Sequence, residues 1–405
     1  MIRKFLILSD LHAYSSVKPG APAPSLLQAD SAAFRSDMIE GVNSTIKKEG
    51  LGVDCIICPG DIADKADAVA QANIWHRLAS LKDELGASHL IATTGNHDID
   101  SRLKHSDFDP KSSLQSLNPP FPGGSEIEID KYWSRNFVIY TFDEVRIVNL
   151  NSSAFHGISS DEDDGRTAEY LRGRVSSKTS SAIKAAVQSD TRQFKYNILL
   201  THHHVYKNDD IYENDNSEMI GAGRLLRDLQ EVCDTPWLII HGHQHYPRIE
   251  YYLGGSGSPI VFSAGSLSAQ ISADLSSRAP NQFYHLEIDD DANATGNWSP
   301  CGRIKAWHWV KREGWIRSPS TFNIPYECGF GCRENNITIG DQIVDVITNA
   351  TLPFVTLGDL LKSVPHFKFV LPTEQKKIID HVEKSGIIVA LMSDQDPHRS
   401  TFRKA

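Results

Sequence analysis

The sequence predicts an α/β fold built on a mostly parallel β-sheet, and three observations support this. The N-terminal quarter alternates apolar runs of strand length with helical patterns, the order of consecutive strand–helix–strand units. Ligand-type side chains stand where the apolar runs end, as expected at the carboxyl edge of such a sheet. Beyond residue 249, short apolar runs follow one another without a helix, which suits a second sheet packed on the first.

The N-terminal elements follow from apolar spacing and from the residues that end each run. Phe34, Val42 and Ile46 recur at helical spacing, and Gly50 provides a stop signal for that helix. The predicted elements are, in order, the strand 4–9, the helix 31–49, the strand 53–58, the helix 67–85 and the strand 88–93.

The middle of the chain begins with a polar, proline-rich segment, 99–127, which we interpret as a loop on the substrate side. Two alternating runs then meet at Asp143 and Glu144 and predict a β-hairpin. Residues 161–164 and 207–220 are predicted as polar loops. The remaining elements of this part are the hairpin strands 137–143 and 145–151, the helix 178–189, the strand 196–201, the helix 221–231 and the strand 236–241.

The C-terminal part changes character near residue 321. The runs before it read as the strands 249–253, 259–263 and 283–288 and the hairpin 303–317. The runs after it read as the short helices 341–350, 356–363 and 373–385, which prolines separate. Because 405 residues are many for one hydrophobic core, we expect a main domain over 1–320 and a small, mainly helical C-terminal domain over 321–405. The role of that second domain is open, with a second copy of the chain or a protein partner as alternatives.

Bulk composition narrows the class of partners. The formal net charge of −10 argues against broad electrostatic attraction to nucleic acid, although a local basic groove stays compatible with it. Trp307, Trp309 and Trp315 interleave with basic residues, and packing at a sheet edge is favoured over a nucleic-acid surface. No apolar stretch has the length of a bilayer span, so no membrane partner is expected.

The N-terminus and the cysteines predict a cytoplasmic location. The first apolar run stops after four residues at Ser9 and Asp10, and no small-residue cleavage site follows, so it does not match a signal peptide. The six cysteines form no disulfide pattern, and those in apolar runs read as small buried side chains. Cys328 and Cys332 have the spacing of half a zinc knuckle, but no second pair completes one.

Metal-ligand chemistry recurs at five predicted strand ends. Asp10 and His12 are two positions apart, so in an extended segment they point the same way and can bind one ion together. Imidazole and carboxylate together suit manganese, iron, zinc, nickel or cobalt better than magnesium or calcium. Two such ions about 3.5–4 Å apart can hold a phosphoryl oxygen and the attacking hydroxide. The other four groups are Gly60-Asp61, Gly95-Asn96-His97-Asp98, His202-His203-His204 and Gly242-His243-Gln244-His245.

In their order and placement these motifs resemble the motif set of the calcineurin-like metallophosphoesterases, over about residues 3–315. Each motif alone is weak, whereas all five in order make a specific signal. The resemblance implies an αββα sandwich of two mixed β-sheets flanked by helices, which agrees with the pattern above. The early Asp-x-His and the Gly-Asp-x-x-Asp at Gly60 are similar to those of bacterial-type members that include cyclic nucleotide phosphodiesterases.

The resemblance also implies the roles of the site residues. Two divalent or mixed-valence transition-metal ions are expected, with manganese favoured. His97 would pair with Asp98, remain unbound to metal and stabilise or protonate the leaving oxygen, while a metal-bridging hydroxide attacks phosphorus in line. His203 remains the rival of His202 in the triple-histidine segment. The implied ligands are Asp10, His12 and His245 for one ion, Asn96, His202 and His243 for the other, and Asp61 as the bridge.

A metal-dependent phosphodiesterase is the favoured function, with a phosphate ester as substrate. The tyrosine that purple acid phosphatases carry close to the Gly-Asp motif has no counterpart near Asp61, so a charge-transfer iron site is not expected. A DNA exonuclease, for which nucleic acid would be the substrate, and a phosphomonoesterase remain alternatives within the same superfamily. A metal-bound, non-catalytic binding module is the alternative of another class, and the intact His97-Asp98 pair argues against it.

Overall fold

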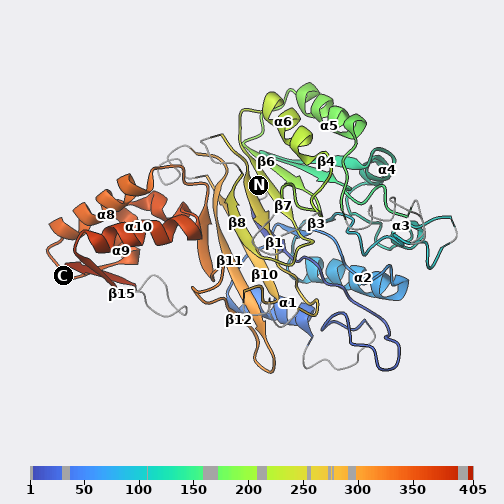
Figure 1. Cartoon of the computed structure of the whole chain (residues 1–405), viewed down its shortest axis with the longest axis horizontal. Helices are drawn as coiled ribbons and strands as arrows, with labels where there is room; N and C mark the ends of the chain where they lie inside the picture. Colours follow the sequence, from blue (N-terminus) through green and yellow to red (C-terminus); the bar gives the residue numbers. More distant parts are fainter. Residues whose placement is uncertain are drawn as a thin grey trace.

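The computed structural model describes residues 3–29, 37–106, 108–157, 172–207, 217–252, 257–271, 275, 278–290, 298–390 and 400–404. Two mixed β-sheets pack face to face, and helices cover their outer faces (Figure 1). The main apolar core lies between the sheets and joins Ile7 and Ile57 from one to Ile198 and Ile240 from the other. The predicted α/β fold with two mixed sheets flanked by helices is therefore confirmed.

The first sheet has seven strands in the order β12-β11-β10-β1-β2-β3, with β13 also paired to β11. β1 runs parallel to β2, which runs parallel to β3, and the other pairings are antiparallel. The register places Ile7 opposite both Ile57 and Tyr284. Its strands are β1 (Lys4–Ile7), β2 (Cys55–Cys58), β3 (His89–Ala92), β10 (Gln282–Asp289), β11 (Cys301–Val310), β12 (Gly314–Arg317) and β13 (Glu327–Phe330).

The second sheet has six strands in the order β4-β5-β6-β7-β9-β8. β5, β6, β7 and β9 run parallel to one another, and β4 and β8 close the sheet with antiparallel hairpin-type pairings. The predicted hairpin around Asp143 is the β4–β5 pair. The strands are β4 (Phe137–Phe142), β5 (Val145–Leu150), β6 (Tyr196–Leu200), β7 (Trp237–His241), β8 (Arg248–Tyr251) and β9 (Ile260–Ser263).

One sequence-based expectation about the sheets is wrong. The strands after residue 249 do not form a sheet of their own: β8 and β9 extend the second sheet, whereas β10 to β13 complete the first. The central strand β1 lies between β2 and β10, so strands that are far apart in the sequence meet in the middle of one sheet. Apolar alternation identifies a strand but not its partner, because pairing is settled by tertiary contacts.

Four predicted helices flank the sheets. α1 (Met38–Lys48) and α2 (Ala68–Glu84) lie on the first sheet, and α5 (Ser177–Ser189) and α6 (Ala222–Val232) lie on the second (Figure 1). Asp37 caps α1 by accepting the backbone N–H groups of the first turn, so the helix begins after it. The predicted residues 31–36 of this helix, and the predicted acidic loop 161–164, lie outside the described residues.

Two further helices, α3 (Ser112–Gln115) and α4 (Glu126–Arg135), were not predicted. The sequence does carry a start signal for α4. The backbone N–H and the Oγ of Ser125 both donate to the Glu128 carboxylate, at 2.8 and 2.7 Å. This is the Ser-x-x-Glu capping box, which marks a helix start within the polar segment that was interpreted as a loop.

The C-terminal part forms a further apolar cluster, in which Ile343, Val382 and Phe402 meet and which Cys301 of β11 joins. It lies at one end of the molecule (Figure 1). Its small sheet of order β14-β16-β15 was not predicted. β13 lies beyond residue 320 and still pairs with β11, and the division at residue 320 stays a prediction. The elements are α8 (Asn336–Asn349), β14 (Val355–Thr356), α9 (Leu357–Ser363), η3 (Pro365–Phe369), α10 (Pro372–Lys384), β15 (Ile387–Ala390) and β16 (Thr401–Lys404).

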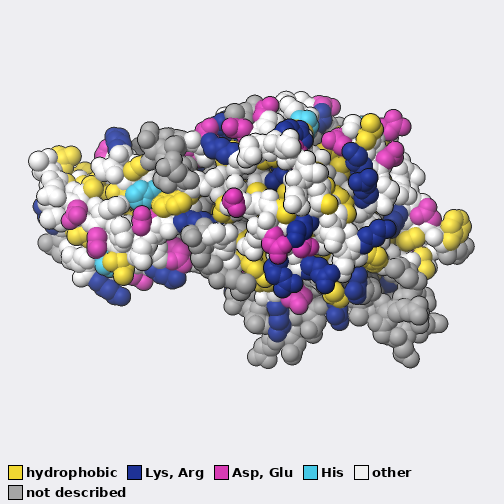
Figure 2. Space-filling view, turned by 90° about the horizontal axis from the view of Figure 1, so that it is seen from above, with side chains coloured by type: hydrophobic (Ala, Val, Ile, Leu, Met, Phe, Trp, Pro, Cys, Tyr) yellow, Lys and Arg dark blue, Asp and Glu magenta, His cyan; other side chains and the backbone are white. Residues whose placement is uncertain are grey.

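The surface features agree with the composition. Figure 2 shows Lys and Arg side chains interspersed with Asp and Glu side chains on the face that it displays. The ring of Trp307 stacks on Phe283 with centroids 4.8 Å apart, and Trp315 is buried and donates from Nε1 to the Met38 carbonyl. This confirms that these tryptophans pack against the sheet. Within the described ranges, no helix has the length and apolar character needed to cross a membrane.

Candidate metal centre

The candidate site lies where the parallel strands of both sheets end. The first sheet contributes residues that follow β1, β2 and β3, and the second contributes residues that follow β6 and β7. Every ligand expected from the sequence is brought to this one place, and the four candidate ligand groups found in the structure draw largely on them. The residues concerned are Asp10 and His12 after β1, Asp61 after β2, Asn96 and His97 after β3, His202 after β6, and His243 and His245 after β7.

Five of these residues adopt a left-handed backbone. The φ angles are 52° at Asp10, 46° at His12, 53° at Asp61, 73° at His243 and 53° at His245. Such a conformation costs a non-glycine residue about 1–3 kcal/mol and persists only where the surrounding structure fixes it. Because five strained residues lie together here, we infer that the fold tolerates this cost in order to direct polar side chains into the site.

Two motif glycines allow the loops to approach one another. A Cβ on Gly95 would lie 2.1 Å from Asp61 Oδ1, and one on Gly242 would lie 2.3 Å from Asp10 Oδ2. Neither position has room for a side chain, because distances below about 3 Å are far inside van der Waals contact. The glycines before Asn96 and His243 are therefore required by packing at the site.

The first group of donors joins Asp10, His12 and His245. His245 Nε2 lies 3.4 Å from Asp10 Oδ1, and the Nε2 atoms of His12 and His245 lie 3.0 Å apart. Asp10 is held by the Ser9 hydroxyl and by the backbone N–H of His243, which donates to Oδ1 at 3.0 Å. Three ligand atoms, from the segments after β1 and β7, thus lie within 4.8 Å of one another.

The second group joins Asn96, His202 and His243. Asn96 Oδ1 lies 3.0 Å from His202 Nε2 and 3.1 Å from His243 Nδ1. Asp61 stands between the two groups, with its Oδ2 atom 3.3 Å from His12 Nε2 and 3.3 Å from His202 Nε2. One carboxylate oxygen is therefore equidistant from a histidine of each group.

These donors fit a pair of transition-metal ions. Metal–nitrogen and metal–oxygen bonds of about 2.0–2.2 Å place neighbouring ligand atoms about 3.0–3.5 Å apart, and the spacings above fall in this range. Burial raises the pKa of Asp61, but the charges of His202, His97 and His12 outweigh it and hold that pKa well below its usual value. Burial and the neighbouring His202 lower the pKa of His243. An ionised carboxylate and a neutral imidazole are the forms that bind metal.

The structure bears on the choice between His202 and His203. His202 Nε2 faces Asn96 and Asp61, and its Nδ1 lies 2.8 Å from the Pro59 carbonyl, which fixes the ring. His203 Nδ1 lies 2.8 Å from the Ser152 hydroxyl, and its buried Nε2 has no hydrogen-bond partner among the described residues. His203 also belongs to a candidate group with His202 and His243. His202 is favoured as the ligand because its Nε2 lies 3.3 Å from Asp61 Oδ2, the same distance that separates His12 Nε2 from that oxygen.

The partner of His97 differs from the one expected. His97 Nδ1 lies 2.8 Å from Asp64 Oδ1, whereas the expected partner Asp98 contacts backbone groups instead. Burial lowers the pKa of His97, but Asp61 and Asp64 outweigh it and raise that pKa above 6.5. The backbone N–H of His97 also donates to Asp61 Oδ1 at 2.8 Å. Asp64 was absent from the predicted site residues, although it is the last residue of the Gly-Asp-x-x-Asp pattern.

Asp98 instead joins two loops of the site. Its carboxylate accepts the backbone N–H groups of Asp61 and Ile62 at 2.8 Å, of Gly95 at 2.9 Å and of Ala63 at 3.3 Å. It is fully buried, and burial together with the nearby Asp61 charge raises its pKa to about 7. Asp98 therefore does not pair with His97 as expected. Its hydrogen bonds instead connect the loop after β2 with the loop after β3.

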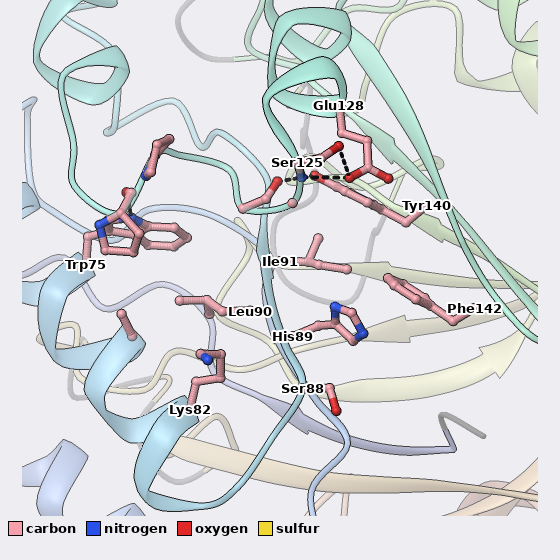
Figure 3. Close-up of a pocket in the computed structure, with 15 residues that line it drawn as sticks. Trp75, Lys82, Ser88, His89, Leu90, Ile91, Ser125, Glu128, Tyr140 and Phe142 are labelled. Atoms are coloured by element: carbon pink, nitrogen blue, oxygen red, sulfur yellow. Dashed lines mark hydrogen bonds between the residues drawn. The ribbon is translucent and has the colours of Figure 1, made fainter.

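A cavity of about 370 Å³ lies away from this centre (Figure 3). It opens beside the start of β3, where His89 lies against Phe142 with ring centroids 4.2 Å apart, and Trp75 and Glu128 also line it. The candidate metal ligands follow the opposite end of β3. This cavity is therefore separate from the site described above.

Comparisons with known proteins bear on the family. A sequence profile described as calcineurin-like phosphoesterase matches residues 3–247, which is more than half of the 405-residue chain. No curated protein sequence gives a significant match.

Several solved structures are similar to the chain. A purple acid phosphatase, PPD1, from yellow lupin (Lupinus luteus) seeds is 13% identical with a TM-score of 0.47, and the match covers 76% of this chain and 52% of the lupin chain. PhoD is 9% identical with a TM-score of 0.48, over 82% of this chain and 70% of PhoD. A 5′-nucleotidase precursor from Thermus thermophilus is 12% identical with a TM-score of 0.34, over 72% of this chain and 52% of the precursor. The chain thus spans about half the length of the lupin phosphatase.

Proposed function

Because the chain belongs to the calcineurin-like phosphoesterase family, we propose that it is a dinuclear metal-dependent phosphodiesterase. One observation carries the dinuclear part of the proposal. Asp61 Oδ2 is 3.3 Å from a histidine nitrogen of each donor group, the position of a ligand shared by two ions. The diester preference is the finer part, and it rests on the Asp-x-His at Asp10 and the Gly-Asp-x-x-Asp pattern rather than on distances.

The proposed ligands divide as the resemblance implies. When bound, the two divalent ions, with Mn²⁺ favoured, would neutralise charge on the phosphoryl oxygens and supply a water nucleophile at neutral pH. Imidazole nitrogens and carboxylate oxygens in one site suit such ions. We assign Asp10, His12 and His245 to one ion, Asn96, His202 and His243 to the other, and Asp61 to both.

His97 is proposed to give its proton to the leaving oxygen. Its side chain is 30% exposed and is not needed as a metal ligand, so it can meet a substrate. Asp64 holds the ring through Nδ1, which leaves Nε2 as the atom that carries the transferred proton. The hydrogen bond from the His97 backbone to Asp61 Oδ1 fixes the proton donor relative to the proposed bridging ligand. Asp98 is proposed to position the loops after β2 and β3, because its carboxylate accepts backbone N–H groups from both.

A phosphomonoesterase and a DNA exonuclease use the same centre, so the substrate decides between them. A non-catalytic metal-binding module would not need a proton donor, and the ordered pair of His97 and Asp64 argues against that alternative.

The proposed function is tested with two chromogenic esters. The chain is loaded with Mn²⁺, and hydrolysis of bis-p-nitrophenyl phosphate, a diester, is compared with that of p-nitrophenyl phosphate, a monoester. We expect faster hydrolysis of the diester. Faster hydrolysis of the monoester would replace the diesterase by a phosphomonoesterase, and absence of both reactions in the metal-loaded protein would contradict the proposed activity.

A further inference from the structure

A second cavity, of about 190 Å³, lies directly beside the proposed proton donor. The residues that give it its character come from the loop after β3 and from the segment after Asp61. We call it the basic pocket, and its lining includes Asn96, His97, Lys65, Arg102, Lys104 and His105. The pocket shares two of these, Asn96 and His97, with the candidate metal centre.

The loop that carries three of the basic residues is folded around a carboxylate. Asp100 is buried and accepts the backbone N–H groups of Lys104, His105 and Ser106 at 2.8, 2.6 and 2.9 Å. The Ser101 hydroxyl donates to the Asn96 carbonyl at 2.8 Å, which attaches the loop to a proposed metal ligand. The only carboxylate lining the pocket among the described residues is therefore engaged with backbone donors.

Lys65, in the segment after Asp61, also lines the pocket. It follows Asp64, the partner of His97, and both Lys65 and Ala66 have a left-handed backbone, with φ of 50° and 56°. The backbone N–H of Ala66 donates to the His97 carbonyl at 2.7 Å, so this strained turn is fixed against the proton donor. The Lys65 side chain is 75% exposed and lies 3.3 Å from Asp64. Its ammonium is therefore accessible to a ligand.

Charge and size indicate what the pocket binds. Lys65, Arg102 and Lys104 bring three basic side chains to the pocket, in a chain whose net charge is −10, so the pocket is a local reversal of the overall charge. Pockets that enclose a whole small molecule measure about 300–1,000 Å³, whereas this one measures about 190 Å³. It suits an anionic group on a larger substrate, and Arg and Lys are the residues that commonly bind phosphate.

The position beside His97 identifies which part of the substrate that is. His97 protonates the leaving oxygen in the proposed reaction, so whatever lies just beyond His97 belongs to the leaving group. We propose that the basic pocket binds a phosphate carried by the leaving alcohol, and that the preferred substrates are phosphodiesters whose departing alcohol bears a further phosphate. This inference rests on the proposed function.

The reaction balances as a hydrolysis. Water adds to phosphorus, the bond from phosphorus to the leaving oxygen breaks, and the proton on His97 Nε2 passes to that oxygen. The products are a phosphomonoester and an alcohol that keeps its own phosphate. His97 regains a proton from the water that has been consumed.

The test compares matched dinucleotides in the full-length, Mn²⁺-loaded chain. The substrates are thymidylyl-thymidine and its forms with a terminal phosphate at the 5′ or the 3′ end, so that either alcohol can leave with a phosphate. We expect kcat/KM to be higher for one phosphorylated form by about tenfold or more, the usual effect of a hydrogen bond to a charged group. In Arg102→Gln and Lys65→Gln this ratio should fall toward one. In Lys311→Gln, which removes an exposed charge in the turn between β11 and β12, the ratio should stay as in the parent.

Equal kcat/KM for all three dinucleotides in the parent would overturn the proposal. So would an unchanged ratio in both pocket variants. Hydrolysis of bis-p-nitrophenyl phosphate, whose leaving group has no phosphate, reports on the proposed function separately.

Binding to metal-free protein decides the question if no ester is hydrolysed. Calorimetric titration with thymidine 3′,5′-bisphosphate should give a Kd that rises about tenfold in Arg102→Gln, by the same hydrogen-bond argument. If the parent does not bind this probe, or if the variant binds equally well, the basic pocket is not a phosphate site.

Discussion

Replacing Asp64 with Asn should slow hydrolysis of esters with poor leaving groups and spare those with good ones. Asp64 Oδ1 lies 2.8 Å from His97 Nδ1, and its side chain is only 13% exposed, so solvent screens this contact weakly. A hydrogen bond to a charged group contributes about 1.5–3 kcal/mol. If the Asp64 contact acts mainly on the proton transfer, this corresponds to a loss of about 10- to 150-fold in kcat.

The assay uses diesters that share one phosphoryl group and differ in the pKa of the departing alcohol. A leaving group such as p-nitrophenolate departs without a proton, whereas an alkoxide needs one from His97. The plot of log kcat against the leaving-group pKa should therefore be steeper for Asp64→Asn than for the parent. Metal content is measured alongside, because Asp64 Oδ1 also lies 3.8 Å from His12 Nδ1, and His12 is a proposed ligand.

Two controls separate positioning of His97 from other effects. Asp67→Asn changes a nearby acid that caps α2 by accepting the Ala70 N–H, and its plot should keep the parent slope. In a His97→Ala background, Asp64→Asn should have little further effect, because the group on which it acts is gone. Equal slowing of all leaving groups with full metal content, or full additivity of the two changes, would refute the reasoning.

Two further predictions concern stability. Gly95→Ala should lower the melting temperature and the bound metal, since its Cβ would lie 2.1 Å from Asp61 Oδ1 and overpacking costs about 1–3 kcal/mol. Gly223→Ala in α6, where an added Cβ would have no neighbour within 4 Å outside its own helix, should be neutral or stabilising. Burial raises the pKa of Glu49, but Arg317 outweighs burial and holds that pKa below 4.5. Glu49→Gln should therefore lower the free energy of unfolding by about 0.5–1 kcal/mol near pH 7. In urea unfolding, this difference between parent and variant should vanish as the pH falls below 4.5 and through the lowered pKa. A difference that does not shrink as the pH falls below 4.5 would contradict this.

Much of the fold could be predicted because periodicity and stop signals are local. α2 and α6 begin and end within a residue or two of the predicted bounds, and the hairpin at Asp143 is present. The allocation of strands to sheets could not be predicted, because an apolar run indicates a strand and not its partner, and the partners of β8 and β10 are fixed by long-range packing. α4 could have been found from Ser125 and Glu128.

The site was predictable for a related reason. Parallel strands place their carboxyl ends at one edge of a sheet, so the ligand-type residues after β1, β2 and β3 gather at one edge of the first sheet, and those after β6 and β7 gather at one edge of the second. Packing of the two sheets brings these two edges together. What the sequence could not reveal is which neighbour a side chain selects. The resemblance implied that His97 pairs with Asp98. The Asp98 carboxylate instead accepts backbone N–H groups of the loop after β2, and Asp64, just before the turn at Lys65, contacts His97.

The arrangement also explains why the site spans so much of the chain. β1 lies centrally in the first sheet and β7 lies within the second, and Asp10 after β1 accepts the backbone N–H of His243 after β7. The relative positions of the proposed ligands therefore depend on how the two sheets pack against each other. A change that shifts one sheet relative to the other should disturb both donor groups together.

The central claim is that two ions share Asp61, and electron paramagnetic resonance of the Mn²⁺-loaded chain, with metal analysis of the same sample, tests it most directly. The account predicts about two ions per chain and a spectrum of two spin-coupled Mn²⁺ ions, as expected for ions about 3.5–4 Å apart. In Asp61→Ala the coupling should disappear, the metal content should fall, and hydrolysis of bis-p-nitrophenyl phosphate should be lost. An uncoupled spectrum in the parent, or parental turnover in Asp61→Ala, would contradict the shared-ligand centre.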